Sequence, residues 1–351
     1  MSPPPSTERI LIVGSGGIGG VLACHLLEAG ITPWLATTNE RVRQAWLSGE
    51  AQLDGRRLGR RVAADHVIDS ARGHGPFDVV FVAVQPPQID DVVASLAGAL
   101  ADRGRVVCLS NGLCEERIAR ALGPDRVIGA VVAWGARMPE PGDFVQTAPG
   151  GFRVGAFDGS SGPELDRVCE LLSSVGRVKR TDNLRGARFS KLALNCAVST
   201  LGAISGQTLG ELLLQRPARS LALAILREAT QIARAEGIRL EPVTRLNLEW
   251  LSEPRSAVGS AAQHALLLGV GLRYRRMRSS TVAARERGRA PAVDYLNGEL
   301  TERGERFGVP TPINQAARAL VWEIAAGQRQ AGAAALESLA RVLRQQPRGA
   351  T

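Results

Sequence analysis

The sequence predicts a doubly wound α/β domain with a mostly parallel sheet, followed by an all-helical domain. In the first half of the chain, a short apolar strand runs into a glycine-rich turn and a helix, and further apolar strands then alternate with helices. After about residue 184, only helical periodicity remains. The 351 residues leave room for two domains of ordinary size.

The first elements follow a proline-rich stretch, residues 1–8, that we expect to be disordered. Arg9–Val13 is predicted as a strand that leads directly into a glycine turn. A helix over Ile18–Glu28 follows and ends at Gly30, and Thr32–Ala36 supplies the next strand. This order is the start of a βαβ unit.

The turn between this strand and helix reads Gly14-Ser15-Gly16-Gly17-Ile18-Gly19. Gly14 permits the tight turn, Gly16 lets a pyrophosphate approach the backbone, and Gly19 lets helix and strand pack closely. In this strand–turn–helix context the spacing predicts a dinucleotide site in a Rossmann-type domain. A glycine turn without a ligand is the alternative.

The remaining elements of the first domain alternate in the same way. Strands are predicted at Phe77–Val84, Arg105–Ser110 and Arg126–Trp134, a hairpin at Asp143–Gly155 and a last strand at Gly176–Arg180. Helices are predicted at Ile89–Leu100 and Glu115–Leu122. Gln85, Asn111 and Gly112 follow strand ends, the edge at which parallel sheets bind ligands.

The second domain is predicted to contain helices alone. Its helical segments are Ala187–Leu201, Leu209–Gly237, Val243–Trp250, Val258–Leu272, Ala292–Phe307, Ile313–Ala326 and Ala331–Leu343. We expect domains over residues 9–182 and 183–344, a loose tail over 345–351, and chemistry in the cleft between the domains.

Composition excludes several classes of protein. The net charge of +9 comes from 41 arginines against two lysines, Lys179 and Lys191, and the densest basic stretch, Arg273–Arg289, carries no nucleic-acid motif. We therefore expect no nucleic-acid partner. No apolar stretch is long enough to span a membrane and no signal peptide is visible, so no membrane association and a cytoplasmic location are expected by default. The five cysteines indicate neither disulfides nor a zinc site, and no metal is expected.

A polar stripe marks one predicted helix of the second domain. Arg188, Lys191, Asn195 and Ser199 recur along one side of an otherwise apolar segment. A lone lysine in an arginine-rich chain suggests that proton transfer is needed, because lysine can give up a proton and arginine cannot. A surface lysine on a solvated stripe is the alternative.

Four segments together resemble the 2-dehydropantoate 2-reductase (ketopantoate reductase) family from about Arg9 to Ala326. They are Gly14–Gly19, Leu109-Ser110-Asn111-Gly112-Leu113, Lys191-Leu192-Ala193-Leu194-Asn195-Cys196 and Asp294-Tyr295-Leu296-Asn297-Gly298. The resemblance implies a helical domain like the C-terminal domain of 6-phosphogluconate dehydrogenase. It also implies NADPH-dependent reduction of a 2-oxo acid to a 2-hydroxy acid, and it leaves a homodimer open.

The resemblance also implies roles for single residues. Lys191 is similar to the general acid, Asn111 to an asparagine beside nicotinamide and substrate, Asn195 to a substrate-orienting amide, and Ser280 to a serine that holds the substrate carboxylate. The chain departs from the family at Gln85 (usually lysine), Ser199 (usually asparagine) and Ala292 (usually a glutamate that binds the substrate hydroxyl). Three polar groups of the substrate pocket are thus lost or shortened. A shifted alignment in which Glu286 or Glu299 supplies the carboxylate is the alternative.

The cofactor is predicted to be NADP. A site for NAD usually has an acidic residue at the end of the second strand, whereas this strand ends in Ala36-Thr37-Thr38-Asn39, and Arg41 and Arg43 lie close enough in sequence to meet a phosphate. The family's usual arginine aligns with Thr37.

The sequence supports two main hypotheses. The first is an NADP-dependent oxidoreductase that acts on a small carbonyl or imine substrate less polar than ketopantoate. The second is a nucleotide-sensing or partner-binding protein on a reductase scaffold, with little or no turnover.

Overall fold

The computed structural model describes residues 8–243, 246–253, 256–277 and 290–346. The chain divides into two compact units between Leu184 and Arg185. In the described part of the chain, no helix is long and apolar enough to cross a membrane.

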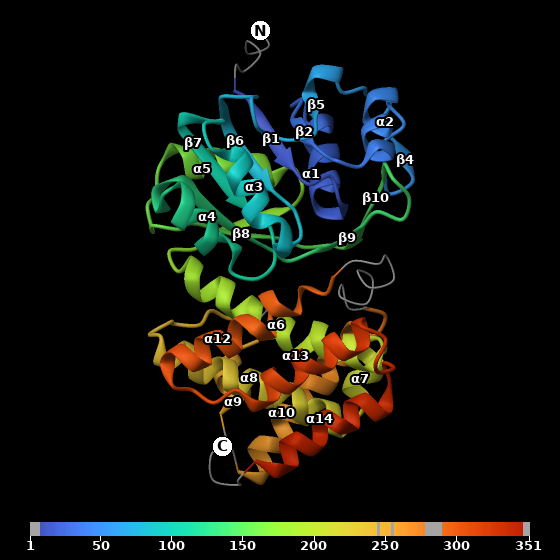
Figure 1. Ribbon diagram of the computed structural model, residues 1–351, viewed down its shortest axis with the longest axis vertical. Coiled ribbons are helices and arrows are strands. Elements are labelled where there is room, and N and C mark those ends of the chain that lie inside the picture. Colours follow the sequence, from blue (N-terminus) through green and yellow to red (C-terminus); the bar gives the residue numbers. More distant parts are fainter. Residues whose placement is uncertain (1–7, 244–245, 254–255, 278–289, 347–351) are drawn as a thin grey trace. The chain divides into compact units, whose positions relative to one another are not determined.

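The first unit is built on an eight-stranded sheet (Figure 1) with the strand order β12-β11-β8-β7-β6-β1-β2-β5. All neighbours pair in parallel except β11 and β8. The order of its six central and edge strands, from β5 to β8, is that of a doubly wound dinucleotide-binding sheet. The strands are β1 (Ile10–Val13), β2 (Trp34–Ala36), β5 (Val67–Ile68), β6 (Phe77–Val82), β7 (Leu100–Cys108), β8 (Val127–Val132), β11 (Gly151–Ala156) and β12 (Arg177–Arg180).

Helices cover both faces of this sheet, which is why its strands read as continuous apolar runs. Alternate residues of β1 divide between two cores: Ile10 and Ile12 pack in one, Leu11 and Val13 in the other. Helices α1 (Gly17–Glu28), α2 (Glu40–Ser48) and α5 (Pro163–Ser173) contribute to the first core. Helices α3 (Ile89–Leu96) and α4 (Cys114–Leu122) contribute to the second. Short 3-10 turns lie at η1 (Ala64–His66), η2 (Pro86–Gln88) and η3 (Pro124–Arg126).

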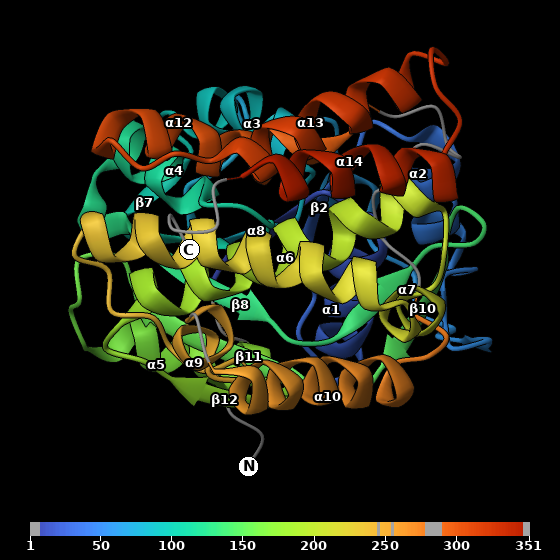
Figure 2. The same cartoon turned by 90° about the horizontal axis from the view of Figure 1, so that it is seen from below.

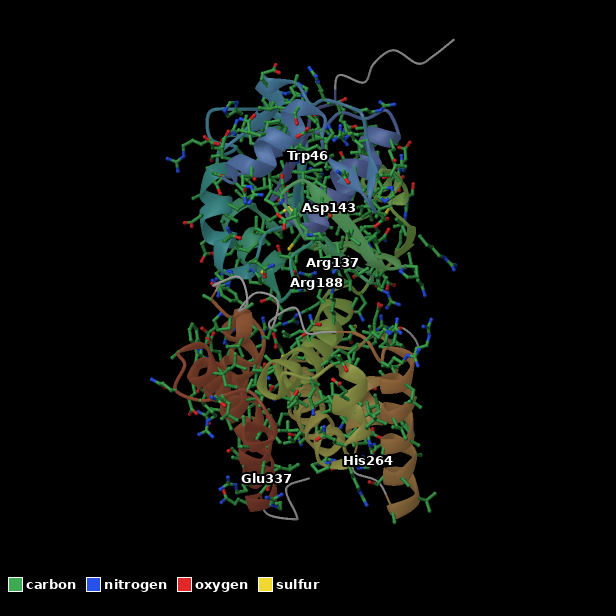
Figure 3. The ribbon with its side chains drawn as sticks, turned by 90° about the vertical axis from the view of Figure 1, so that its right-hand side faces the viewer. Trp46, Arg137, Asp143, Arg188, His264 and Glu337 are labelled. Carbon is green, nitrogen blue, oxygen red and sulfur yellow. The ribbon has the colours of Figure 1, made fainter. Side chains whose placement is uncertain are left out.

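A second sheet of four short strands, β4-β3-β10-β9, packs against α1. Its strands are β3 (Gln52–Leu53), β4 (Arg56–Arg57), β9 (Gly135–Arg137) and β10 (Asp143–Ala148). Phe144 of β10 stacks on Trp46 of α2 with 5.2 Å between ring centroids (Figure 3 labels Trp46). The Phe144 ring also lies so close to Gly20 that a Cβ there would be 2.0 Å from it. Stacking and close packing thus attach this sheet to the first βαβ unit.

The predicted hairpin over Asp143–Gly155 is wrong. Strand β10 pairs with β9 and β3, whereas β11 pairs with β8 and β12. Gly150 and Gly151 do not have the positive φ of a tight hairpin turn. Instead, a Cβ on them would lie 2.2 Å from the Ala133 carbonyl oxygen and 1.9 Å from that of Arg177. These glycines therefore serve close strand packing.

Boundaries of other predicted elements also differ. The helix expected over Ala292–Phe307 begins as a 3-10 turn over Ala292–Tyr295 and is α-helical only from Asn297. The helix expected over Ile89–Leu100 ends at Leu96, because Leu100 is already part of β7 and pairs there with Phe77 of β6. The helix expected over Leu209–Gly237 is broken at Gln215, which is extended with ψ 123°. In the segment expected as a helix over Val243–Trp250, Val243 and Leu246 form a β-bridge and the helix of the structure begins at Leu248.

The second unit contains helices packed around α8 (Arg216–Ala235), which contacts six others. In chain order the helices are α6 (Leu184–Ser205), α7 (Leu209–Leu214), α8, α9 (Leu248–Ser252), α10 (Ala257–Arg273), the 3-10 turn η4 (Ala292–Tyr295), α12 (Asn297–Phe307), α13 (Pro312–Ala325) and α14 (Ala333–Gln345) (Figure 2). All five cysteines of the chain are buried thiols; Cys24, Cys108, Cys114 and Cys169 lie in the first unit and Cys196 in the second.

Candidate functional site

The glycine turn lies between β1 and α1, at the point where the order in which strands are added to the sheet reverses. Strands β1 and β6 are neighbours there, and their chain connections run to opposite sides of the sheet. In an open α/β sheet, this switch point at the carboxyl ends of the strands is where ligands bind. The order β7-β6-β1-β2 brings the ends of four consecutive strands to this edge.

The glycines of this turn have different surroundings. Gly14 has a φ of +99°, and a Cβ there would lie 2.8 Å from the Ala83 carbonyl oxygen. A Cβ on Gly19 would lie 2.0 Å from the Gly14 carbonyl oxygen, and one on Gly17 would lie 2.9 Å from the Ala136 backbone of β9. By contrast, a Cβ on Gly16 would meet no described atom within 4 Å. The backbone is therefore packed on both sides of Gly16 and open at Gly16 itself.

Ser15 adds an unsatisfied donor beside this open position. The residue is 7% exposed, and its Oγ has no hydrogen-bond partner in the described part of the chain. Helix α1 has no acidic residue in its first turn, so the partial positive charge of its N-terminus is not neutralised there. An open backbone, an unpartnered hydroxyl and a helix N-terminus together fit the pyrophosphate of a dinucleotide. Ile18, predicted with this group, packs its side chain against the core, so only its backbone faces the turn.

The loops after β6 and β7 are joined at the same edge. Ser110 Oγ donates to the Val84 carbonyl oxygen over 2.8 Å. Asn111 follows as an exposed residue, and its carbonyl oxygen accepts a hydrogen bond from Cys114 Sγ over 3.1 Å. Gln85 is exposed, and its backbone N–H donates to Gln88 Oε1 over 3.2 Å. The predicted residues Gln85 and Asn111 thus follow adjacent strands.

The side chains that follow β2 differ in their exposure and in the hydrogen bonds and ion pairs that they form. Thr37 is 8% exposed, and its Oγ1 accepts from the Asn39 N–H, so the side chain supports the turn; Thr38 is exposed. Arg43 is held by the Val67 carbonyl oxygen at 2.6 Å and by Asp69. The Arg41 side chain is 76% exposed, and its ion pair with Glu140 spans 3.5 Å. Arg41 is therefore the arginine of this segment that can turn toward a ligand.

Sequence reasoning missed a hollow beside Arg41. It has a volume of about 450 Å³ and is lined by α2, the β3–β4 strands and the chain before β10. Arg57 of β4 also lines it, together with the four acidic residues Glu40, Glu50, Glu140 and Asp143. The two-residue strands that bring Arg57 there have no periodicity of their own, and the signal that could have found them is the Asp54-Gly55 turn between them, where both residues have positive φ.

Helix α6 carries the predicted polar stripe of the second unit. Lys191, Asn195 and Ser199 are half-buried, and Arg188 is 2% exposed. The adjacent residue Ser190 is fully buried and accepts a hydrogen bond from the Glu241 N–H over 3.1 Å.

A buried hydrogen-bond network holds the side of α6 opposite Lys191. Thr200 Oγ1 donates to Asn297 Oδ1, and Asn297 Nδ2 donates to the Cys196 carbonyl oxygen at 3.4 Å and to Asn314 Oδ1 at 2.8 Å. Asn314 Nδ2 in turn donates to Glu228 Oε2 at 2.6 Å, and both Glu228 oxygens accept backbone N–H groups at the start of α13. Burial raises the pKa of the Glu228 carboxyl. The network joins α6, α8, α12 and α13, and sequence reasoning did not identify its members Thr200, Asn314 and Glu228.

The other predicted residues of this unit are only partly described. Ala292 begins η4 and is half-buried. Ser280 and Glu286 lie outside the described residues. Glu299, the other alternative to a carboxylate at Ala292, is bound by Arg303 Nε at 2.7 Å. No group of three or more possible metal-ligating side chains occurs among the described residues.

Comparison with known proteins covers nearly the whole chain. The 2-dehydropantoate 2-reductase of Archaeoglobus fulgidus is 25% identical over 321 residues, 91% of this chain and 99% of that protein. The enzyme of the same name from Mesorhizobium japonicum is 25% identical over 341 residues, with 90% and 98% coverage.

Solved structures agree on the fold. A PanE/ApbA family ketopantoate reductase from Ralstonia eutropha JMP134 superposes with a TM-score of 0.75 at 24% identity, covering 92% of this chain and 99% of its own. A D-mandelate dehydrogenase in complex with NADH and anilino(oxo)acetate gives a TM-score of 0.74 at 18% identity, with 95% and 99% coverage. The family model described as ketopantoate reductase PanE/ApbA matches residues 10–159, and the model of its C-terminal part matches residues 183–325. The chain therefore belongs to the ketopantoate reductase (PanE/ApbA) family.

Proposed function

We propose that this protein is an NADPH-dependent reductase that uses Lys191 as general acid on a 2-oxo acid or a related carbonyl or imine, and that ketopantoate is not its substrate. The observation that carries the proposal is the glycine turn, which is open only at Gly16 and has the unpartnered Ser15 hydroxyl beside it. The relatives named above include a 2-dehydropantoate 2-reductase, and a structural neighbour is a D-mandelate dehydrogenase, which supports a reductase or dehydrogenase activity.

The cofactor part of the proposal rests on the edge of the sheet at the carboxyl ends of β1 and β6. Backbone N–H groups at the start of α1 and the Ser15 hydroxyl would hold the pyrophosphate, with Gln85 and Asn111 at the neighbouring strand ends. The exposed guanidinium of Arg41 would meet the 2′-phosphate, and Arg57 lines the same hollow. A bound nicotinamide dinucleotide supplies the hydride for reduction.

The second part of the proposal, proton donation, rests on Lys191. When a carbonyl carbon accepts a hydride, its oxygen takes up negative charge and needs a proton. The ammonium of Lys191 would donate that proton, and solvent would then reprotonate the amine. Asn195 and Ser199, one and two turns further along α6, would orient the substrate, with Asn111 beside it. The similar serine at Ser280 would bind its carboxylate.

The third part of the proposal, the choice of substrate, rests on Ala292. The family has a carboxylate at this position that accepts a hydrogen bond from the hydroxyl of ketopantoate, and Ala292 has no polar side-chain atom. An unpaired buried hydroxyl costs about 1–3 kcal/mol, or roughly 5- to 150-fold in kcat/KM. The natural substrate should therefore carry an apolar group, or none, where ketopantoate carries its hydroxyl.

An experiment with Ala292→Glu tests this point. Wild type and variant are compared on ketopantoate and on its deoxy analogue, in which a methyl replaces the hydroxymethyl group. The wild type should prefer the analogue, and the variant should shift toward ketopantoate by roughly 5- to 150-fold in kcat/KM. A wild-type preference for ketopantoate of about 100-fold or more would contradict the altered substrate.

The changes at Gln85 and Ala292 also favour a second candidate, a nucleotide-sensing or partner-binding protein without turnover. A screen of NADPH oxidation against a panel of 2-oxo acids, ketones and imines separates the two candidates. NADPH binding without oxidation of NADPH by any member of the panel would favour the sensor.

A further inference from the structure

The segment Asp294-Tyr295-Leu296-Asn297-Gly298 has no role in the reaction proposed above, although it carries part of the resemblance to the family. It spans the end of η4 and the start of α12. Ala292, the position proposed to select the substrate, is half-buried at the start of η4, two residues before this segment. The contacts of the segment therefore bear on how residue 292 is held in place.

Asp294 is held by two donors on α13. Arg318 Nε donates to Asp294 Oδ1 over 2.6 Å, and Trp322 Nε1 donates to the same oxygen over 3.0 Å. Arg318 and Trp322 are four residues apart, so both lie on one side of the helix. Helix α13 contacts both η4 and α12 (Figure 1 labels the two helices). The Asp294 carboxylate thus attaches η4 to one face of α13.

Gly298 leaves room for this contact. A Cβ on Gly298 would lie 3.2 Å from Arg318 Nε and 3.3 Å from Arg318 Cζ, so a larger residue would press on the guanidinium. Gly298 lies inside α12 and does not have a positive φ, so the backbone does not require glycine here. The close approach of Arg318 explains the glycine instead.

Asn297 attaches the same segment to α6. Its Nδ2 donates to the Cys196 carbonyl oxygen over 3.4 Å, and the side chain is fully buried. Val293 and Leu296, on either side of Asp294, are buried as well. The junction of η4 and α12 is therefore joined to α13 through Asp294 and to α6, the helix of Lys191, through Asn297.

Stability alone does not account for the contacts of Asp294. The side chains of Arg318 and Asp294 are 36% and 33% exposed, and an ion pair with this exposure contributes little to the free energy of unfolding. Two donors from one helix nevertheless fix the position of the oxygen that they share, whereas a single donor would let the carboxylate turn. The contacts therefore serve the geometry of η4 more than the stability of the unit.

We propose that Arg318 and Trp322 are positioning residues that act through Asp294. They hold residue 292 in place and thereby set the choice between substrates that differ in the group facing this position. The inference rests on the proposed function for the role of residue 292. Loss of either donor should loosen η4 and weaken the choice of substrate, while Lys191 stays on a helix that Asn297 still holds.

The test measures the ratio of kcat/KM for ketopantoate and its deoxy analogue. Arg318→Met and Trp322→Phe each remove one donor and keep an apolar side chain of similar size. In both variants the preference of the wild type should fall roughly fivefold, the usual effect of one lost hydrogen bond. The kcat for the preferred substrate should stay within about twofold of the wild type, because proton donation is unchanged. Asp294→Ala should lose the preference in the same way, and Asp294→Asn, which keeps an acceptor oxygen, should retain most of it.

Arg329→Met is the matched control. Arg329 Nε donates to Glu323 Oε2 of α13, also over 2.6 Å, and the two side chains are 39% and 37% exposed. This ion pair joins α13 to the chain that follows it, so its loss does not release Asp294. Arg318→Met and Arg329→Met should have similar melting temperatures, and only Arg318→Met should change the preference. An equal loss of preference in the two variants would overturn the inference.

Amide hydrogen exchange separates a failure of this inference from a failure of the proposed function, because exchange needs no substrate. Exchange over residues 292–296 should be faster in Arg318→Met and Trp322→Phe than in the wild type and unchanged in Arg329→Met. Unchanged exchange in the first two variants would overturn the inference, as would faster exchange with an unchanged preference. Faster exchange in a protein that reduces no 2-oxo acid would support the hold of α13 on residue 292 and overturn the proposed function instead.

Discussion

The glycine turn of the first unit and helix α6 of the second are held in place by different means. Around Gly14 and Gly19, backbone packs directly on backbone, with no room for a Cβ. The side of α6 opposite Lys191 is held instead by side chains, in the buried chain of hydrogen bonds from Thr200 through Asn297 and Asn314 to Glu228. The first arrangement resists any added atom, whereas the second depends on each polar atom having its partner.

The largest effect on activity is expected from replacing Lys191 of α6. Lys191→Ala should lower kcat by about 10²–10⁴, the usual contribution of general acid catalysis, while NADPH affinity stays nearly constant. Steady-state kinetics and a fluorescence titration check both halves. Lys179→Ala, which removes the only other lysine from an exposed position on β12, is the control. A loss below tenfold in a folded Lys191→Ala protein would mean that another group or water delivers the proton.

Removing the middle of the hydrogen-bond network tests how α6 is held. Asn297→Ala leaves the partner atoms on Thr200 and Asn314 without their bonds and should cost about 1–3 kcal/mol of unfolding free energy. We expect kcat to fall as well, with KM less affected, because the lysine would be less well positioned. Asn247→Ala, which removes an N-cap at the start of α9, should lower stability without changing kcat. Equal effects of the two variants on kcat would contradict the positioning role.

A pair of substitutions tests the glycine turn. Gly19→Ala puts a Cβ 2.0 Å from the Gly14 carbonyl oxygen and should destabilise the first unit by about 1–3 kcal/mol. Gly16→Ala meets no described atom and has an ordinary φ of −81°, so its melting temperature should stay near that of the wild type. Its NADPH affinity should nevertheless fall about tenfold, because the methyl occupies the open position. Unchanged affinity in Gly16→Ala would place the pyrophosphate elsewhere.

An effect of the same size, confined to one of the two cofactors, is expected for cofactor choice. Arg41→Ala should weaken NADPH binding about tenfold and leave NADH binding unchanged, since only NADPH carries the 2′-phosphate. Arg43→Ala should lower stability without changing the preference, because its guanidinium already holds Val67 and Asp69. Tighter binding of NADH than of NADPH by the wild type would show that the NADP prediction is wrong.

The sequence predicts those parts of the fold that have local patterns. Strands buried on both faces, such as Phe77–Val82, are continuous apolar runs, and the glycine spacing indicates the first turn. The two-residue strand β3 is not predictable in this way, because it pairs with β10, about ninety residues away. Strand β4 pairs with β3 across Asp54-Gly55, a local hairpin signal that the periodicity of such short strands does not reveal. The Gly150-Gly151 pair predicts a turn in the sequence because the residues that crowd it, Ala133 and Arg177, are not adjacent to it in the chain.

The candidate site shows the same limit. Lys191 and Asn195 are recognisable from helical spacing and from the resemblance to the family. The contact of Asn314 with Glu228 joins residues 86 positions apart, and neither residue lies in a motif that indicates it. Arg41 and Arg43 could not be distinguished in the sequence, and only their surroundings show that one is engaged and the other exposed.

The distribution of buried thiols gives each unit its own chemical reporter of unfolding. Four thiols lie in the first unit and one in the second, and burial raises the pKa of the Cys24 and Cys196 thiols, which suppresses the reactive thiolate. An alkylating reagent should therefore modify a cysteine only when the surrounding structure opens. Mass spectrometry of partly alkylated protein would then show, without any engineered label, whether the two units open together or one before the other.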